Sequence, residues 1–135
     1  MDRKTLREIA FKMLFEADFR LEEDKGDLYD TLISFHEVKN TEYLNGVFFG
    51  VLENKDEIDG LISDFAKGWK LSRISRVSLT IMRLSVYEMK FRAEDVPFAV
   101  SINEAVELAK KYDDEAAPKF INGVLNGIAG KLGLK

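Results

Sequence analysis

Residues 73–92, RISRVSLTIMRLSVYEMKFR, decide the fold of this 135-residue chain. Apolar residues in this stretch spread around the whole helical wheel and do not keep to one stripe; they are Ile74, Val77, Leu79, Ile81, Met82, Leu84, Val86, Tyr87, Met89 and Phe91. A helix that is apolar on every side is buried on every side, so we expect a central helix against which the others pack. Arg83 and Glu88 are interpreted as structural residues and not as catalytic ones, because buried charges need partners.

The rest of the chain is predicted to be helical, which makes the fold class all-α. Apolar residues recur at spacings of three and four and almost nowhere alternate at two. The further expected helices cover about residues 2–22, 28–35, 43–52, 58–68 and 97–112, followed by a last helix in the tail. Ser101 with Glu104 offers a second possible start for the helix at 97–112, as a capping box. Asp114 is expected as the N-cap of the last helix, with Pro118 in its first turn.

The tail KFINGVLNGIAGKLGLK, residues 119–135, contains two Asn-Gly pairs, the strongest short signal for a β-hairpin. Its apolar residues recur at one and four, however, so we predict a helix. Gly123, Gly127 and Gly130 then form a bare stripe along one side. Each glycine costs about 1 kcal/mol relative to alanine in a helix interior, so a close neighbour should compensate. We expect another helix to cover most of the stripe and the first turn to stay open.

Composition argues for one soluble globular domain and against an enzyme. The chain is 46% hydrophobic and 33% charged, contains no cysteine and has His36 as its single histidine. It contains no phosphate-binding glycine loop, nucleophile motif or H-E-x-x-H motif, and we predict neither a cofactor nor a metal site. A signal peptide and a membrane-length apolar run are both absent, which predicts a cytoplasmic protein.

The formal net charge of -4 hides a segregation of charge along the chain. Residues 21–64 carry 3 basic and 12 acidic groups, whereas residues 65–92 carry 7 and 1. A chain that sorts its charge in this way can present a basic face despite a negative total. Ordinary solvated faces are the alternative interpretation.

Basic and aromatic residues occur together at two places. On the first predicted helix they share a sector beside the core stripe; these residues are Arg3, Lys4, Arg7, Phe11 and Phe15. On the last predicted helix, Lys119 and Phe120 stand at the start of the glycine stripe. Cations neutralise phosphates and aromatic rings stack on unpaired bases, so this combination is typical of single-stranded RNA binding. The alternative is that the phenylalanines face another helix.

The motifs of this chain resemble those of the NusB family. The matching stretches are SLTIMRLSVYEMKFRAEDVPFAVSINEAVELAKKY at residues 78–112, KFINGVLNGIA at 119–129 and, more weakly, REIAFKMLFEADF at 7–19. The resemblance implies a single all-helical RNA-binding domain of about seven helices. It also implies that these helices form two small packed bundles, at about residues 1–67 and about 70–135.

The resemblance further implies a transcription antitermination factor. Such a factor binds the boxA element of ribosomal RNA leader transcripts as a heterodimer with the ribosomal protein NusE, within the RNA polymerase antitermination complex. A homodimer is also compatible with the family. From another class, the alternative is a helical protein-interaction module that does not bind RNA by itself.

The family's RNA-binding positions map onto residues already selected on physical grounds. These positions are Arg3, Lys4, Arg7, Phe15, Lys119 and Phe120. The turn YDDEAAPKF at 112–120 departs from the family, which often has a glycine after the aromatic residue. A further basic stretch, KGWKLSRISR, could extend the RNA face or contact the protein partner through Lys67, Lys70, Arg73 and Arg76.

Overall fold

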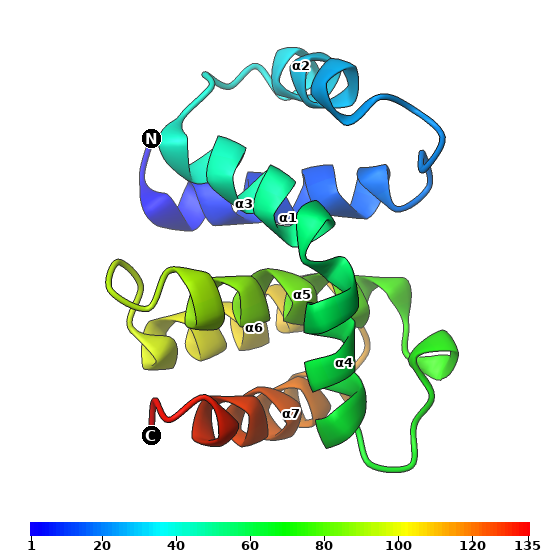
Figure 1. Cartoon of the computed structure of the whole chain (residues 1–135), viewed down its shortest axis with the longest axis vertical. Coiled ribbons are helices and arrows are strands. Elements are labelled where there is room, and N and C mark those ends of the chain that lie inside the picture. The colour runs from blue at the N-terminus through cyan, green and yellow to red at the C-terminus, as the bar shows by residue number, and fades with distance from the viewer. The chain divides into compact units, whose positions relative to one another are not determined.

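The computed structural model describes all 135 residues, which form seven α-helices and one 3-10 helix and divide into two compact units, residues 1–53 and 54–135 (Figure 1). The predicted all-α fold is therefore confirmed. No helix combines the length and the apolar character that crossing a membrane requires. The two units are described separately.

The first unit consists of α1 (Arg3–Ala17), α2 (Lys25–Phe35) and α3 (Glu42–Glu53), with α1 packed against both other helices. Asp2 caps α1, because its carboxylate accepts a hydrogen bond from the Thr5 N–H at 2.8 Å. The α1 helix ends five residues earlier than the expected limit near residue 22. The chain beyond this end is held in a turn by Lys25, whose Nζ donates to the carbonyl oxygens of Arg20, Leu21 and Glu23.

The second unit consists of α4 (Lys55–Phe65), the 3-10 helix η1 (Leu71–Arg73), α5 (Arg76–Phe91), α6 (Phe98–Tyr112) and α7 (Ala117–Lys131). The α5 helix packs against α4, α6 and α7, and α6 also packs against α7 (Figure 1). The prediction of a central helix is therefore confirmed within the second unit, although Phe91 at its end is 43% exposed, so the helix is not buried on every side. It begins at Arg76 and not at Arg73, because Ser75 caps it by accepting a hydrogen bond from the Ser78 N–H.

The boundary between the units differs from the expected one. The resemblance placed it between residues 67 and 70, whereas the compact units divide at Asn54. The reason is that α4 packs against α5 and α7 and so belongs with the second unit.

The charged residues of the central helix have structural partners. Arg83 of α5 donates from Nε and Nη2 to the two carboxylate oxygens of Asp59 in α4, at 2.7 and 2.9 Å. The fully buried carboxylate of Glu88 accepts a hydrogen bond from the Ser101 hydroxyl at 2.8 Å. Ser101 also pairs with Ser85 at 2.8 Å and lies inside α6, so it does not cap a second helix start. The structural interpretation of Arg83 and Glu88 is confirmed.

The tail forms α7 and not a hairpin, but its glycine stripe is mostly open. A β-carbon on Gly127 would lie 2.5 Å from the ring of Phe65 in α4, whereas one on Gly123 or Gly130 would meet nothing within 4 Å. The expectation that a helix covers most of the stripe is therefore wrong, because the only close contact is at Gly127. The first turn of α7 does stay open, with Lys119 exposed and Phe120 half-buried.

Candidate nucleic-acid interface

The basic residues of α1 differ in accessibility. Lys4 is exposed, and Arg3 is half-buried with its guanidinium 4.3 Å from the centre of the Tyr43 ring. Arg7 is only 4% exposed and lies 5.9 Å from the centre of the same ring. Both arginines thus make cation–π contacts with α3. The expected accessible sector contains Lys4 and part of Arg3, whereas Arg7 is buried beside an aromatic ring of the neighbouring helix.

The aromatic residues of α1 form a row that runs from the core to the surface. Phe11 is buried, Phe15 is half-buried and Phe19, just beyond the helix, is 60% exposed. The ring centres of Phe11 and Phe15 lie 6.3 Å apart, and those of Phe15 and Phe19 lie 5.3 Å apart with the rings edge to face. Phe11 is therefore a core residue, and the accessible rings are Phe15 and Phe19.

In the second unit, Lys119 and Phe120 lie at the first turn of α7. The turn before the helix is held by Asp114, whose Oδ1 accepts hydrogen bonds from the N–H groups of Ala116 and Ala117 at 3.0 Å each. The N-cap residue is Ala116 and not Asp114, so the predicted cap lies two residues too early. The carboxylate nevertheless satisfies N–H groups at this helix end, as the prediction required.

The segment that joins α4 to α5 places basic residues on the surface beside α7. Gly68 adopts a positive φ of 81°, a conformation that other residues rarely take, and turns the chain directly before Trp69. Lys67, Lys70, Arg73 and Arg76 are all exposed. Trp69 itself is 55% exposed, and its ring centre lies 6.2 Å from that of Phe120, edge to face.

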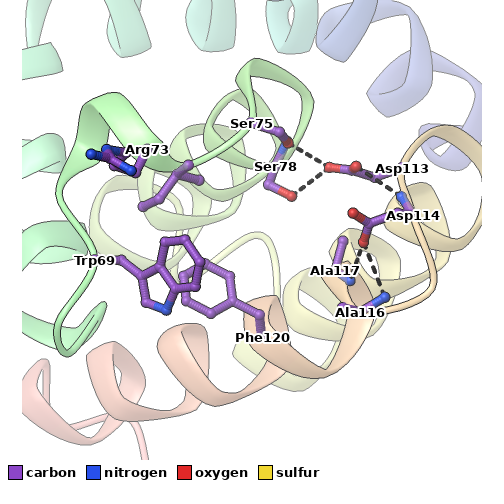
Figure 2. Close-up of a pocket in the computed structure, with 10 residues that line it drawn as sticks. Trp69, Arg73, Ser75, Ser78, Asp113, Asp114, Ala116, Ala117 and Phe120 are labelled. Carbon is purple, nitrogen blue, oxygen red and sulfur yellow. Dashed lines mark hydrogen bonds between the residues drawn. The ribbon is translucent and has the colours of Figure 1, made fainter.

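A cavity of about 240 Å³ lies between this segment and the α6–α7 turn (Figure 2). Ten residues line it: Trp69, Arg73, Ile74, Ser75, Ser78, Asp113, Asp114, Ala116, Ala117 and Phe120. Figure 2 shows the rings of Trp69 and Phe120 on one side and the Asp113 carboxylate with the two serine hydroxyls on another. The structure thus brings Arg73 and Phe120 to one pocket.

The Asp113 carboxylate is held by a hydrogen-bond network. Its Oδ2 accepts from the hydroxyls of Ser75 and Ser78 at 2.6 Å each, and its Oδ1 accepts from the Asp114 N–H at 2.8 Å. Burial by itself raises the pKa of Asp113, but these hydrogen bonds favour the ionised form and leave the pKa below its ordinary value. Asp113 is therefore a carboxylate at neutral pH and acts only as an acceptor.

Trp69 and Asp113 of this pocket were not selected as site residues from the sequence. Trp69 lies inside the basic stretch KGWKLSRISR. The sequence feature that could have identified it is that it is the chain's single tryptophan. Asp113 gave no signal in the sequence, because no sequence spacing connects it with Ser75 and Ser78. No group of three or more His, Cys, Asp or Glu side chains in the chain is placed to hold a metal ion.

The fold and these surfaces define a class: an all-helical protein that presents cations and aromatic rings for binding. Comparison with known proteins identifies the family. The NusB family sequence model matches residues 4–130, and the transcription antitermination protein NusB of Acetivibrio thermocellus is 46% identical over 95% of this chain and 88% of its own length. The chain belongs to the NusB family.

Solved structures agree with this assignment. The T. maritima NusB structure is 36% identical and superposes with a TM-score of 0.85, over 97% of this chain and 92% of that one. A second match is the crystal structure of the antitermination factors NusB and NusE in complex with dsRNA. It is 30% identical, with a TM-score of 0.82 over 96% of each chain. The curated relatives in this family are named for transcription antitermination and not for an enzymatic activity, in agreement with the prediction from the sequence.

Proposed function

We propose that this protein is a transcription antitermination factor that binds the boxA element of ribosomal RNA leader transcripts as a heterodimer with NusE. Family membership over residues 4–130 supports the role in antitermination. The similar solved structure, which contains NusB, NusE and dsRNA, supports RNA and NusE as partners. In this role the protein works in the cytoplasm, within the RNA polymerase antitermination complex.

The observation that carries the RNA-binding part is the surface at the start of α7. Exposed Lys119 adjoins half-buried Phe120, and the ring of Trp69 lies beside Phe120. The segment 66–76 adds four exposed cations and contains no acidic residue. Cations neutralise the phosphates of a single strand, and accessible rings stack on its bases.

The first unit supplies a second set of proposed RNA contacts. Lys4 and the accessible part of Arg3 would neutralise phosphates, and Phe15 offers a ring edge at the surface. Arg7 would act differently, because it is buried against Tyr43. We assign it the role of fixing this ring, over which Arg3 also lies, and not that of a direct phosphate contact.

A salt titration of binding to boxA RNA, with and without NusE, tests the proposal. We expect the affinity to fall steeply with salt, with a slope of about 0.7 per neutralised phosphate on a single strand. Lys119→Ala should lower both the affinity and this slope. Lys131→Ala is the matched control, since Lys131 is an exposed lysine at the other end of the same helix and should leave the slope unchanged. A salt-independent affinity, or equal effects of the two variants, would contradict the proposal.

The second candidate function is a protein-interaction module without RNA binding of its own. Exposed apolar side chains of the first unit favour it: Phe19 is 60%, Leu21 59% and Phe35 77% exposed. Accessible apolar residues of this size are typical of contact surfaces between proteins. If RNA binds only when NusE is present and Lys119→Ala does not weaken that binding, this candidate is supported. Sedimentation of the isolated protein then shows whether the surface joins two copies as a homodimer.

A further inference from the structure

The cavity beside Trp69 combines flat apolar rings with a charged hydrogen-bond acceptor. Trp69 and Phe120 contribute the rings, and Asp113 contributes a carboxylate that two serines hold in place. Its volume of about 240 Å³ lies below the roughly 300–1,000 Å³ of pockets for drug-sized molecules. A pocket of this size suits a single flat ring system better than an extended ligand.

We propose that this cavity holds one unpaired RNA base, stacked on Trp69 and in contact with Phe120, and that Asp113 selects a base with an amino group on its Watson–Crick edge. This inference rests on the proposed function, because it assigns one base of the bound RNA to a particular pocket. It adds Trp69 and Asp113 to the residues expected to contact RNA.

The rings are suited to stacking. Trp69 is 55% exposed, so one face or edge of the indole remains accessible beside the half-buried Phe120. The two rings meet edge to face, which leaves them at an angle and not stacked on each other. Aromatic rings of this kind bind the unpaired bases of single-stranded RNA, because every base has a flat π-face that can stack on a ring.

Basic residues close to the cavity along the chain favour RNA over a protein side chain as the occupant. Arg73 lines the cavity together with the carboxylates of Asp113 and Asp114, and Lys67 and Lys70 are exposed on the same short segment as Arg73. Lys119 is exposed one residue before Phe120. A base held in the cavity would place its phosphates near these cations, whose positive charge complements the strand.

The carboxylate gives the pocket a preference among bases. Asp113 is ionised, and both serine hydroxyls already donate to it, so it can only accept further hydrogen bonds. Guanine, adenine and cytosine each carry an exocyclic amino donor, whereas the one donor on the Watson–Crick edge of uracil, N3–H, lies between two carbonyl oxygens that a carboxylate repels. An amino-bearing base should therefore bind better than uracil at this position.

The single tryptophan makes the proposal directly measurable. Trp69 is the chain's only tryptophan, so its fluorescence reports on the cavity alone. Adding boxA RNA to this protein with NusE should quench the Trp69 fluorescence at the same RNA concentrations at which binding is detected by anisotropy of a labelled RNA. Unchanged emission from a protein saturated with RNA would overturn the proposal.

Variants separate stacking from folding. Trp69→Leu should weaken boxA binding about tenfold, within the range found for loss of one base–aromatic stack, and Trp69→Phe should restore most of the affinity. Phe91→Leu is the matched control, since Phe91 is 43% exposed in the same unit but does not line the cavity. Thermal melts should show that all three variants fold.

A cycle with modified RNA identifies the base. Each base of boxA is replaced in turn with an abasic site. At one position this replacement should weaken binding to the wild-type protein but not to Trp69→Leu, because the stacking contact is already lost in that variant. Placing uracil there should weaken binding severalfold relative to an amino-bearing base. Asp113→Asn should abolish this difference, since an amide both donates and accepts.

The outcomes distinguish this proposal from the function on which it rests. If boxA RNA fails to bind with NusE present, the proposed function itself fails. A second outcome is that RNA binds and Lys119→Ala weakens the binding, but the effects of Trp69→Leu and of every abasic site on affinity are additive. In that case only the pocket proposal fails. If Trp69→Leu weakens NusE binding without RNA and leaves RNA affinity unchanged, the cavity binds protein and the proposal is overturned.

Discussion

The ring of Phe65 in α4 occupies the space that a side chain on Gly127 of α7 would need. Its Cδ1 atom lies 2.5 Å from the position of a β-carbon at Gly127, well inside van der Waals contact. Gly123 and Gly130 on the same helix have open space at the corresponding positions. One glycine of the stripe is therefore required by packing between helices, and the other two are not.

Alanine substitutions along this stripe should have opposite effects. Gly127→Ala should lower the free energy of unfolding by about 1 kcal/mol, because overpacking costs about 1–3 kcal/mol and exceeds the helix-propensity gain. Gly123→Ala should raise it by about 0.5–1 kcal/mol, since the β-carbon meets nothing and the helix gains propensity. Urea denaturation measures both.

The comparison is internally controlled, because both substitutions lie in the same helix four residues apart. Replacing the opposing ring with a smaller side chain, as in Phe65→Leu, should reduce the loss in free energy of unfolding that Gly127→Ala causes. Equal stabilisation by both alanines would show that the ring does not limit the space at Gly127.

The Arg83–Asp59 pair should behave as a largely buried ion pair. The two side chains are 11% and 18% exposed and joined by two hydrogen bonds. Asp59→Ala should lower the free energy of unfolding by about 2–3 kcal/mol, slightly less than for a fully buried pair, because Arg83 then lacks its carboxylate partner. Thermal and urea unfolding measure the loss.

The double variant Arg83→Met with Asp59→Leu provides the control. Removing both charges eliminates the buried cation that has lost the Asp59 carboxylate, so this variant should be more stable than Asp59→Ala alone. Half-buried Lys90, whose Nζ lies 3.3 Å from Oε1 of the more exposed Glu57, offers a comparison nearer the surface. There, Glu57→Ala should cost less than about 1 kcal/mol. Similar costs at the two pairs would contradict the role given to burial.

Helix positions could be predicted from the sequence because the spacing of apolar residues is a local property. The central helix, for example, is recognised from one stretch that is apolar on all sides. Helix ends were predicted less well, because contacts from outside the helix set them. Lys25 holds the turn after α1 from the following helix, and no pattern within α1 shows this.

The candidate site was predictable only in part for a similar reason. Lys119 and Phe120 are accessible as expected, since the first turn of α7 lies at the surface. A helical wheel places Arg7 next to the core stripe but does not show that Tyr43 of α3 lies against it. Trp69 lies outside the regular helices, where apolar spacing gives no signal, so only the structure connects it with Phe120.

Acid should weaken the hydrogen bonds between the Asp113 carboxylate and the serine hydroxyls at the start of α5. The folded-state pKa of Asp113 lies below its ordinary value of 3.8, so the stabilisation is present above that value and is lost as the pH falls through the folded pKa. Ser78→Ala should raise this pKa toward the ordinary value and lower the free energy of unfolding at pH 7. We expect a loss of about 1 kcal/mol, because Asp113 is only half-buried.

Two measurements check this prediction. Carbon-13 NMR of the Asp113 carboxyl follows its titration in the wild type and in Ser78→Ala. Urea unfolding at pH 7 and at a pH below the folded pKa should show the stability difference shrinking in acid. Ser78 is a cleaner position than Ser75, which also caps α5. A stability difference that is constant with pH would exclude the carboxylate as its source.

Arg7 and Lys4 should separate folding from RNA binding within α1. Arg7 is 4% exposed beside the Tyr43 ring, so Arg7→Ala should lower the free energy of unfolding by about 1–2 kcal/mol through lost packing and cation–π contact. Exposed Lys4 should change stability by less than about 0.5 kcal/mol when replaced by alanine. Its effect should instead appear as a salt slope for boxA RNA that is reduced by about 0.7.

Lys39→Ala is the control for Lys4, because Lys39 is an exposed lysine of the same unit outside α1. It should leave both stability and the salt slope unchanged. Arg7→Lys separates the two roles of Arg7, since it retains a positive charge but not the flat guanidinium that packs on an aromatic ring. If Arg7→Lys keeps the salt slope and still loses stability, Arg7 supports the fold. The opposite outcome is that Arg7→Lys keeps the wild-type stability, whereas Arg7→Ala reduces the salt slope without unfolding the protein. Arg7 then contacts phosphate directly, and its assignment as a buried support is wrong.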